Sequence, residues 1–130
     1  MRHLIAGVLA LGLSTSGALA DTMQDVIGAQ LQAFNDRDVP KAFGYASPMI
    51  KRLFGNPLNF GTMVARGYPM VWDNSDVRFL EPREEGPFFF QRVMMRDPNG
   101  AVHIIDYKMI REGDTWQIDG VQLLPPAVGA

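Results

Sequence analysis

The sequence predicts an α+β fold in which N-terminal helices pack on a curved antiparallel sheet. Two observations predict it. Residues 21–67 carry apolar side chains at helical spacing, interrupted by capping residues and prolines. Residues 77–124 alternate between apolar and polar side chains and contain two tight-turn sequences. Because the helices come first and the strands follow, the order favours an antiparallel sheet covered by helices.

Residues 1–20 have the features of a secretory signal peptide. A short basic start precedes an apolar run from Leu4 to Leu13, and the segment ends in the small-x-small sequence Ala18-Leu19-Ala20. The apolar run is too short to span a membrane. We therefore expect cleavage after residue 20 and export to the periplasm or out of the cell. The alternative is an uncleaved anchor or a buried N-terminal helix.

The remaining residues, 21–130, are expected to form a single domain of about 110 residues, enough to bury a core. There is no cysteine, which leaves no disulfide and no thiolate metal site, and we expect neither a metal nor a cofactor. The net charge is −2, and removal of Arg2 with the leader makes it −3. This weak acidity gives no reason to expect nucleic acid or, after cleavage, a membrane as partner.

The main helix is expected over Asp21–Asp38, opened by Thr22 as N-cap with Asp25 three residues later. Apolar residues at helical spacing give it one buried face, which Gln30 extends. Shorter helices are expected at residues 40–46 and 49–54, since proline and capping residues begin them. Gly55-Asn56-Pro57 is expected to end the second of these, and a further short helix through Phe60 is expected to end at Gly67.

The next segment, Tyr68–Trp72, contains Pro69 and is expected to be a short extended piece at a sheet edge. Val77–Glu81 alternates as a better strand. Residues 82–87 are expected to connect it, as a charged loop, to three further strands.

The turn Asp97-Pro98-Asn99-Gly100 predicts the pairing of the next two strands. Proline suits the second turn position and glycine the position that needs a positive φ. With Asp97 opposite Ala101, Gln91 faces Tyr107 and Arg92 faces Asp106 on the other side of the sheet.

The turn Gly113-Asp114 predicts the last pairing in the same way. Met109 is expected opposite Ile118, Tyr107 opposite Gly120, and Ile105 opposite Gln122. Lys108 is then opposite Asp119 on the other face. A slip of one residue in either turn would exchange the two faces.

One face of these strands is apolar with a few polar insertions, and we expect the long helix to cover it. Buried polar groups must find partners, because leaving one unpaired costs roughly 1–3 kcal/mol. The candidate binding residues on this face are Gln91, His103, Tyr107, Trp116 and Gln122. Two alternatives remain open: Tyr107 could bond a backbone carbonyl in a filled core, and the other polar residues could lie at exposed strand ends.

Several runs resemble a bacterial exported family known as domain of unknown function 4864. They include Gly67-Tyr68-Pro69-Met70-Val71-Trp72, Val77-Arg78-Phe79-Leu80 and Asp106-Tyr107. The order of elements also resembles the nuclear transport factor 2-like or cystatin-like cone. The resemblance implies a conical cavity between the helix and the concave sheet. Proteins of related fold use this cavity to bind small ligands or for isomerase or dehydratase chemistry, and in others side chains fill it. It brings no catalytic residues.

The first functional hypothesis is a non-catalytic exported protein. It would bind a small, partly apolar ligand in the cone or pair as a homodimer through the outer sheet face. That face is expected to carry an apolar patch of Phe88, Phe90, Met94, Ile104 and Ile110.

The alternative is a small cofactor-independent isomerase-like or dehydratase-like enzyme using Tyr107 and His103, since histidine titrates near neutral pH. Such an enzyme needs an acid or base facing a donor inside the cavity. Asp106 and Asp119 are expected on the other face, each opposite a cation, which favours the non-catalytic hypothesis.

Overall fold

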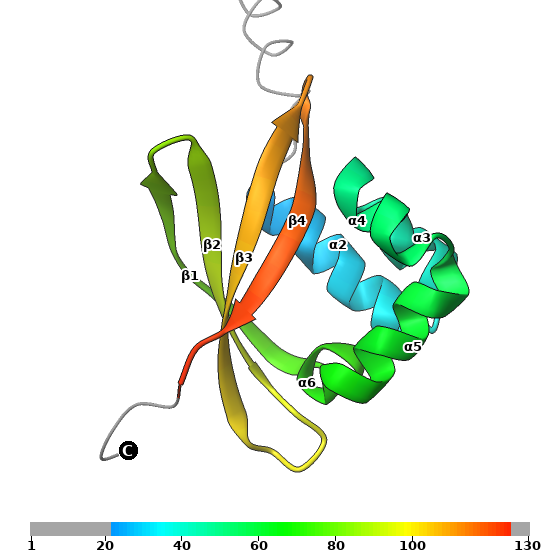
Figure 1. The fold of residues 1–130 in the computed structure, drawn as a ribbon. Helices are drawn as coiled ribbons and strands as arrows, with labels where there is room; N and C mark the ends of the chain where they lie inside the picture. The colour runs from blue at the N-terminus through cyan, green and yellow to red at the C-terminus, as the bar shows by residue number, and fades with distance from the viewer. Residues whose placement is uncertain (1–21, 126–130) are drawn as a thin grey trace, which may run out of the picture.

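The computed structural model describes residues 22–125, which form helices followed by a four-stranded antiparallel sheet (Figure 1). The predicted signal peptide lies outside the described residues. The helices are α2 (Met23–Asn35), α3 (Val39–Gly44), α4 (Pro48–Phe54), α5 (Pro57–Gly67) and α6 (Pro69–Trp72). The strands are β1 (Ser75–Glu85), β2 (Phe88–Arg96), β3 (Val102–Glu112) and β4 (Thr115–Leu123), in this order across the sheet. The α+β prediction is confirmed.

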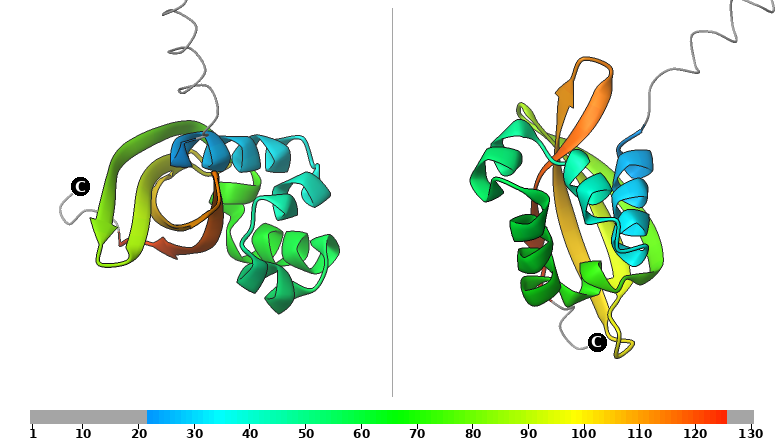
Figure 2. Two further views of the ribbon diagram at one scale, coloured as in Figure 1. Left: turned by 90° about the horizontal axis from the view of Figure 1, so that it is seen from above. Right: turned by 90° about the vertical axis from the view of Figure 1, so that its right-hand side faces the viewer.

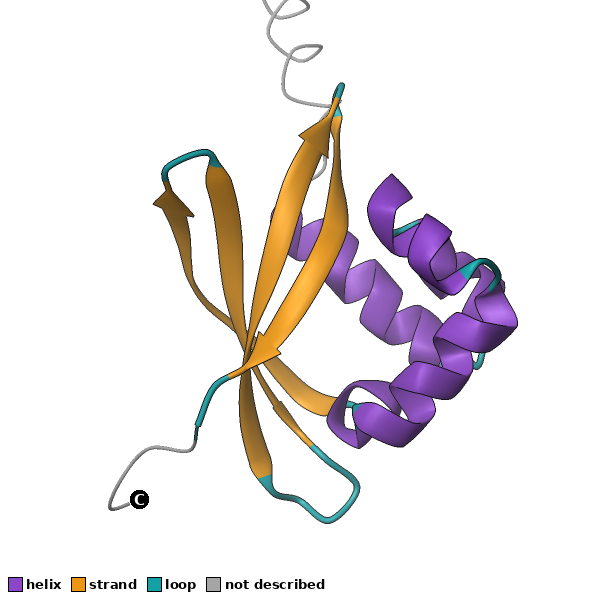
Figure 3. Ribbon diagram, viewed as in Figure 1, coloured by secondary structure: helices purple, strands orange, loops and turns teal. Residues whose placement is uncertain are grey.

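The helices all lie on one side of the sheet, which is strongly curved when seen from above (Figures 2 and 3). The core fills the space between α2 and the inner sheet face, where Val93, Ile105 and Met109 are at most 1% exposed. Among the described residues, no helix is long and apolar enough to cross a membrane.

The predicted capping box opens α2. The Thr22 hydroxyl accepts from the Asp25 N–H at 3.0 Å, and the Asp25 carboxylate accepts from the Thr22 N–H at 3.0 Å. The helix ends at Asn35, three residues earlier than predicted. Arg37 then adopts a left-handed backbone conformation with φ of 59°, which ends the helix.

The predicted short helices are confirmed as α3, α4 and α5, each with proline in its first turn. The prediction of an extended edge at Tyr68–Trp72 is wrong, because this segment contains α6. Pro69 occupies the first helical position, where a missing N–H is tolerated. The N–H groups of Val71 and Trp72 donate to the Tyr68 carbonyl at 2.8 and 2.9 Å.

Asn74 connects α6 to the rest of the fold. Its amide donates to the carbonyls of Leu31 and Val71 at 3.0 and 2.8 Å, and its oxygen accepts from Asn35 at 3.1 Å. Asn74 is 8% exposed. These bonds fix the point where the helices pass into the sheet.

β1 is longer than predicted. It runs to Glu85, so the charged loop expected over residues 82–87 is mostly strand, closed by a turn at Gly86 with φ of 60°. Pro82 is tolerated because β1 is an edge strand, and its pairing with β2 shifts between Phe79 and Pro82.

The predicted β2–β3 register is confirmed at each of its pairs, including Gln91 with Tyr107 and Arg92 with Asp106. Along β3 the side chains alternate, so Tyr107 points to the helical side and Asp106 to the outer face. The proline and glycine of the turn therefore predicted this register correctly.

The β3–β4 register is correct only from the turn to Met109 opposite Ile118. A bulge at Asp119 then shifts the pairing by one residue. Tyr107 faces Val121 and Asp106 faces Gln122, so the predicted pairs Tyr107 with Gly120 and Ile105 with Gln122 are wrong. The Lys108 ammonium still lies 3.7 Å from the Asp119 carboxylate.

The bulge coincides with the docking of residues 45–47 on the outer edge of β4. The Ile118 N–H donates to the Tyr45 carbonyl at 2.9 Å, and the Ser47 N–H donates to the Ile118 carbonyl at 2.8 Å. The Ser47 hydroxyl also donates to Asp119 at 2.7 Å. A helical connection, far away in sequence, therefore fixes the end of the sheet.

On the outer face, Asp106 is 4% exposed and lies between two arginines. Arg92 donates to both of its oxygens at 3.0 and 3.1 Å, and Arg83 Nη2 lies 3.1 Å from Oδ2. The Arg92 hydrogen bonds, more than those of Arg83, hold the pKa of Asp106 below its usual value.

Replacing Asp106 with Asn leaves the Arg92 guanidinium without a carboxylate, whereas Arg83 keeps its ion pair with Glu85. We expect unfolding in urea at pH 7 to show a loss of about 2 kcal/mol, less than in fully buried pairs because the arginines are partly exposed. Since the folded-state pKa is lowered, this stabilisation is complete above roughly pH 4 and is lost as the pH falls through the folded pKa. The variant and the wild type should therefore converge at low pH.

The matched control is Asp114→Asn, at an exposed turn, which should change the unfolding free energy by less than about 0.5 kcal/mol. If the difference in unfolding free energy between Asp106→Asn and wild type stayed constant down to the lowest pH measured, it would contradict a stabilising role for the Asp106 ion pairs.

Candidate functional site

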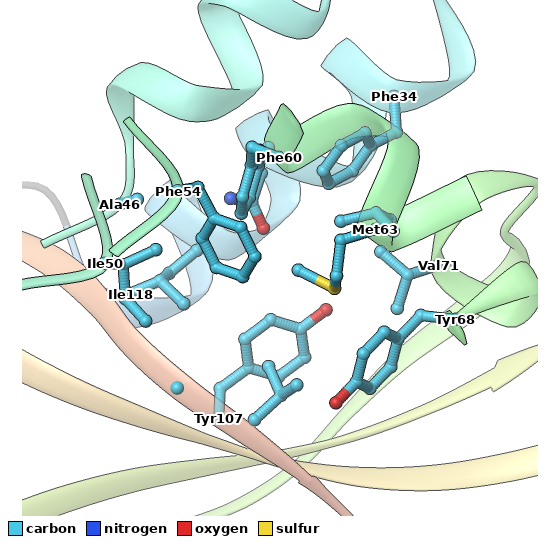
Figure 4. A pocket seen from close by; sticks show the side chains of 14 residues that line it. Phe34, Ala46, Ile50, Phe54, Phe60, Met63, Tyr68, Val71, Tyr107 and Ile118 are labelled. Atoms are coloured by element: carbon cyan, nitrogen blue, oxygen red, sulfur yellow. The ribbon is translucent and has the colours of Figure 1, made fainter. Parts of the chain in front are cut away.

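A cavity of about 240 Å³ lies between the helices and the strands β3 and β4. α2, α4, α5 and α6 supply one wall, and the sheet supplies the other (Figure 4). Its lining is dominated by apolar and aromatic side chains. The lining residues are Gln30, Phe34, Ala46, Ile50, Phe54, Phe60, Met63, Val64, Tyr68, Val71, Tyr107, Ile118, Gly120 and Val121.

Tyr107 supplies the polar group that distinguishes this cavity. Its side chain is 1% exposed, and its hydroxyl has no hydrogen-bond partner among residues 22–125. In Figure 4 the hydroxyl points toward Met63, between that thioether and the ring of Tyr68. Burial raises the pKa of the phenol well above its usual value, so the group stays neutral and can donate one hydrogen bond.

The bulge in β4 keeps the space next to Tyr107 open. It brings Val121 opposite Tyr107, and Gly120 contributes no side chain. A Cβ atom at Gly120 would meet no atom within 4 Å. The opening therefore follows from backbone geometry and a missing side chain.

The other polar residues of the lining are Gln30 of α2 and Tyr68, which lies between α5 and α6. Gln30 is 3% exposed, and its amide nitrogen donates to the Ala42 carbonyl at 3.1 Å. Tyr68 is half-buried. The lining contains no Asp, Glu, Lys, Arg or His. Within residues 22–125, no group of three metal-ligating side chains could hold a metal ion.

Gln91 was predicted to lie on this face, and it does, but it does not line the cavity. It is 1% exposed, and its amide donates to the carbonyls of Leu80 and Arg92 at 2.8 and 2.9 Å. These bonds satisfy backbone groups next to the irregularity in β1. Gln91 therefore has a structural hydrogen-bonding role.

His103 lies at the β2–β3 turn, outside the lining. Its Nε2 is 2.8 Å from the Asp97 carboxylate, which also accepts from the N–H groups of Asn99 and Ala101. The His103 hydrogen bond, first among several causes, lowers the pKa of Asp97. His103 and Tyr107 are four steps apart along β3, a Cα distance of roughly 13 Å. The pair proposed for catalysis is therefore not brought together.

Trp116 and Gln122 also lie outside the lining. The Trp116 ring packs edge-on against Phe89 at 5.0 Å, under the Arg111 guanidinium at 5.1 Å. Gln122 is exposed because the bulge turns it to the outer face, opposite Asp106.

Of the five candidates, Tyr107 alone belongs to the lining. The sequence carried one signal that would have extended the list, because Gln30 is a polar residue within the apolar stripe of α2. It carried no local signal for Val121, which faces inward only because of the bulge.

A sequence model of one family, described as Domain of unknown function (DUF4864), matches residues 17–128. No curated protein and no solved structure matches the chain. The site has to be interpreted from its own geometry.

Replacing Tyr107 with Phe removes a buried hydroxyl that has no partner in the part of the chain that the structure describes. An unpaired buried polar group costs about 1–3 kcal/mol, so the unliganded variant should be as stable as wild type or more stable. Urea unfolding, after denaturation and refolding to remove any bound molecule, measures this. The half-buried Tyr68→Phe is the matched control. A loss of about 1 kcal/mol in Tyr107→Phe alone would instead indicate a satisfied core hydrogen bond.

Proposed function

The chain belongs to the family Domain of unknown function (DUF4864), whose description assigns no activity, so we propose a function from the cavity. We propose that this is an exported, non-catalytic protein that binds a small, uncharged, mostly apolar ligand. The ligand lies between the helices and the sheet and accepts a hydrogen bond from Tyr107. The proposal includes a nuclear transport factor 2-like or cystatin-like cone, which the curved sheet covered by helices supports.

The cavity volume limits the size of the ligand. About 240 Å³ exceeds the roughly 150 Å³ of an engineered cavity that binds benzene. It falls below the 300 Å³ or so at which pockets for drug-sized molecules begin. A molecule of one substituted ring or a short branched chain fits this range.

The lining limits the charge of the ligand. Because the lining contains no ionic side chain, a carboxylate, phosphate or ammonium would lose its hydration without gaining a counter-charge. The neutral phenol of Tyr107 is suited to a carbonyl, ether or hydroxyl oxygen. The ligand class is therefore a neutral molecule with one hydrogen-bonding oxygen.

The observation that carries the proposal is the unpaired Tyr107 hydroxyl inside an apolar cavity. A ligand oxygen at this point would offset the cost of burying the hydroxyl. The catalytic alternative has less support, because His103 lies outside the lining and Asp106 lies on the opposite face between two arginines.

Native mass spectrometry of protein exported by its host, without refolding, should show an added small mass that disappears under denaturing conditions. With that molecule identified, calorimetry should show binding about tenfold weaker to Tyr107→Phe, the equivalent of one hydrogen bond of roughly 1.4 kcal/mol. Val121→Phe places a ring at the cavity wall and should abolish binding.

The control is Tyr68→Phe, which keeps the buried donor at position 107. Circular dichroism and melting temperature verify that each variant is folded. Unchanged affinity in both Tyr107→Phe and Val121→Phe would refute binding in this cavity.

A homodimer through the outer sheet face is a separate proposal, supported by the exposure of Phe88, which is 44%. Cations partly cover this face, because Lys108 lies 4.3 Å from the Phe88 ring centre and Arg83 lies 4.7 Å from that of Phe90. Sedimentation of dilute and concentrated samples should show dimers at high concentration, and Phe88→Ser should prevent them. A strict monomer at high concentration would refute the dimer.

A further inference from the structure

α4 is a helix with apolar side chains on both of its faces. Four of its seven residues are Met, Ile, Leu or Phe, yet none of the seven is buried. Ile50 and Phe54 face inward and line the cavity. Met49 and Leu53 face outward and are 45% and 67% exposed. The described residues, 22–125, leave the outer face of α4 uncovered.

The first turn of α5 continues this exposed apolar surface. Leu58 is 75% exposed, the highest value among the large apolar side chains of the described residues. It borders an apolar hollow formed by α3, α5 and Trp72. We name the exposed surface of Met49, Leu53 and Leu58 the α4–α5 corner, and it lies at the end of the molecule far from β1 (Figures 1 and 2).

The charge around this corner is positive, although the chain as a whole is acidic. From residue 39 to residue 72 there is no Asp or Glu, whereas Lys41, Lys51, Arg52 and Arg66 lie in this segment. None of these four pairs with an acidic residue within 22–125, in contrast to the arginines of β1 and β2. Although the net charge is −2, the charged side chains of residues 39–72 are all basic, and the acidic residues lie elsewhere in the chain.

Lys51 and Arg52 precede Leu53 directly in the last turn of α4. Arg66 follows Leu58 in α5 at roughly 12 Å along the helix axis. Cations therefore border the apolar side chains. The acids closest in sequence, Asp38 and Asp73, are outside the segment, and Asp38 is used as the N-cap of α3.

We propose that the α4–α5 corner docks on the surface of an anionic phospholipid bilayer. Met49, Leu53 and Leu58 insert among the acyl chains nearest the surface, and the four basic side chains contact lipid phosphates. Apolar residues bordered by Lys and Arg are the combination that binds helices to such interfaces. The positive charge favours an anionic bilayer over a neutral protein surface as the partner. This proposal replaces the expectation, drawn from the net charge, that no membrane is involved.

Docking through α4 would bring the cavity next to the bilayer. The role that this implies rests on the proposed ligand function. In α4 the exposed Leu53 is a neighbour of the lining residues Ile50 and Phe54, so the docked surface adjoins the wall of the cavity. An apolar ligand dissolved in the bilayer would meet the protein at the wall of its binding site. The ligand is thus expected to be a neutral lipid-soluble molecule.

The test is co-sedimentation of the mature protein with vesicles. It should bind vesicles of phosphatidylglycerol and phosphatidylcholine in equal parts, bind pure phosphatidylcholine weakly, and dissociate from the mixed vesicles at high salt. Arg52→Glu should weaken partitioning at least about fivefold, the factor equivalent to ~1 kcal/mol for one basic residue near an anionic surface. Leu53→Ser with Leu58→Ser should weaken it at least about tenfold.

Matched controls use exposed residues on the sheet. Val102→Ser with Leu123→Ser, at 45% and 43% exposure, and Arg78→Glu should leave vesicle binding unchanged. No binding to the mixed vesicles, or equal losses in the corner and control variants, would overturn the proposal. A folded protein that does not bind the mixed vesicles would indicate a protein partner at the α4–α5 corner instead.

The docking and ligand proposals can fail separately. Tyr107→Phe should keep full vesicle binding, whereas the Leu53→Ser and Leu58→Ser double variant should keep its affinity for ligand added in solution. Loss of both properties in either variant, with the fold intact, would contradict the assignment of two distinct surfaces.

Discussion

The alternation of side chains along β3 is the constraint on which the rest of the structure depends. It sends Asp106 to the outer face and Tyr107 to the helical face, one residue apart. Outside, the carboxylate is fully engaged by Arg83 and Arg92. Inside, the phenol is buried, and no described residue is its hydrogen-bond partner. A slip of one residue would bury a charge in an apolar cavity, so ion pair and cavity together enforce a single register.

The junction between residues 45–47 and β4 decides the shape of the cavity. Backbone bonds from Tyr45 and Ser47 to Ile118 cover the edge of the sheet, and the adjacent bulge at Asp119 turns Val121 inward. α4 begins directly after this junction, so it is held at one end over the cavity. The helix can line the cavity without being buried, because the sheet edge and not a helix–helix core anchors it.

The two proposed activities use adjoining surfaces of the same helices, α4 and α5. The inner side of α4 and α5 contributes apolar lining, and the outer side presents Met49, Leu53 and Leu58 bordered by cations. The sheet differs in character, because the arginines of β1 and β2 are paired with carboxylates. A neutral interior and a positive, apolar exterior suit a protein that handles an uncharged molecule at an anionic surface. The α4–α5 wall therefore connects the two proposals.

The sequence by itself determined the elements whose causes are local. The capping box at Thr22, the prolines that begin α3 to α5, and the Asp97–Gly100 turn with its β2–β3 register follow from side chains near one another in the chain. Tertiary structure decided α6, the length of β1 and the bulge at Asp119, because contacts distant in sequence control them. It also decided the site: Tyr107 was foreseen by alternation, but Gln91, His103, Trp116 and Gln122 found other partners or positions. Which polar group remains unpaired depends on what the folded chain brings near it.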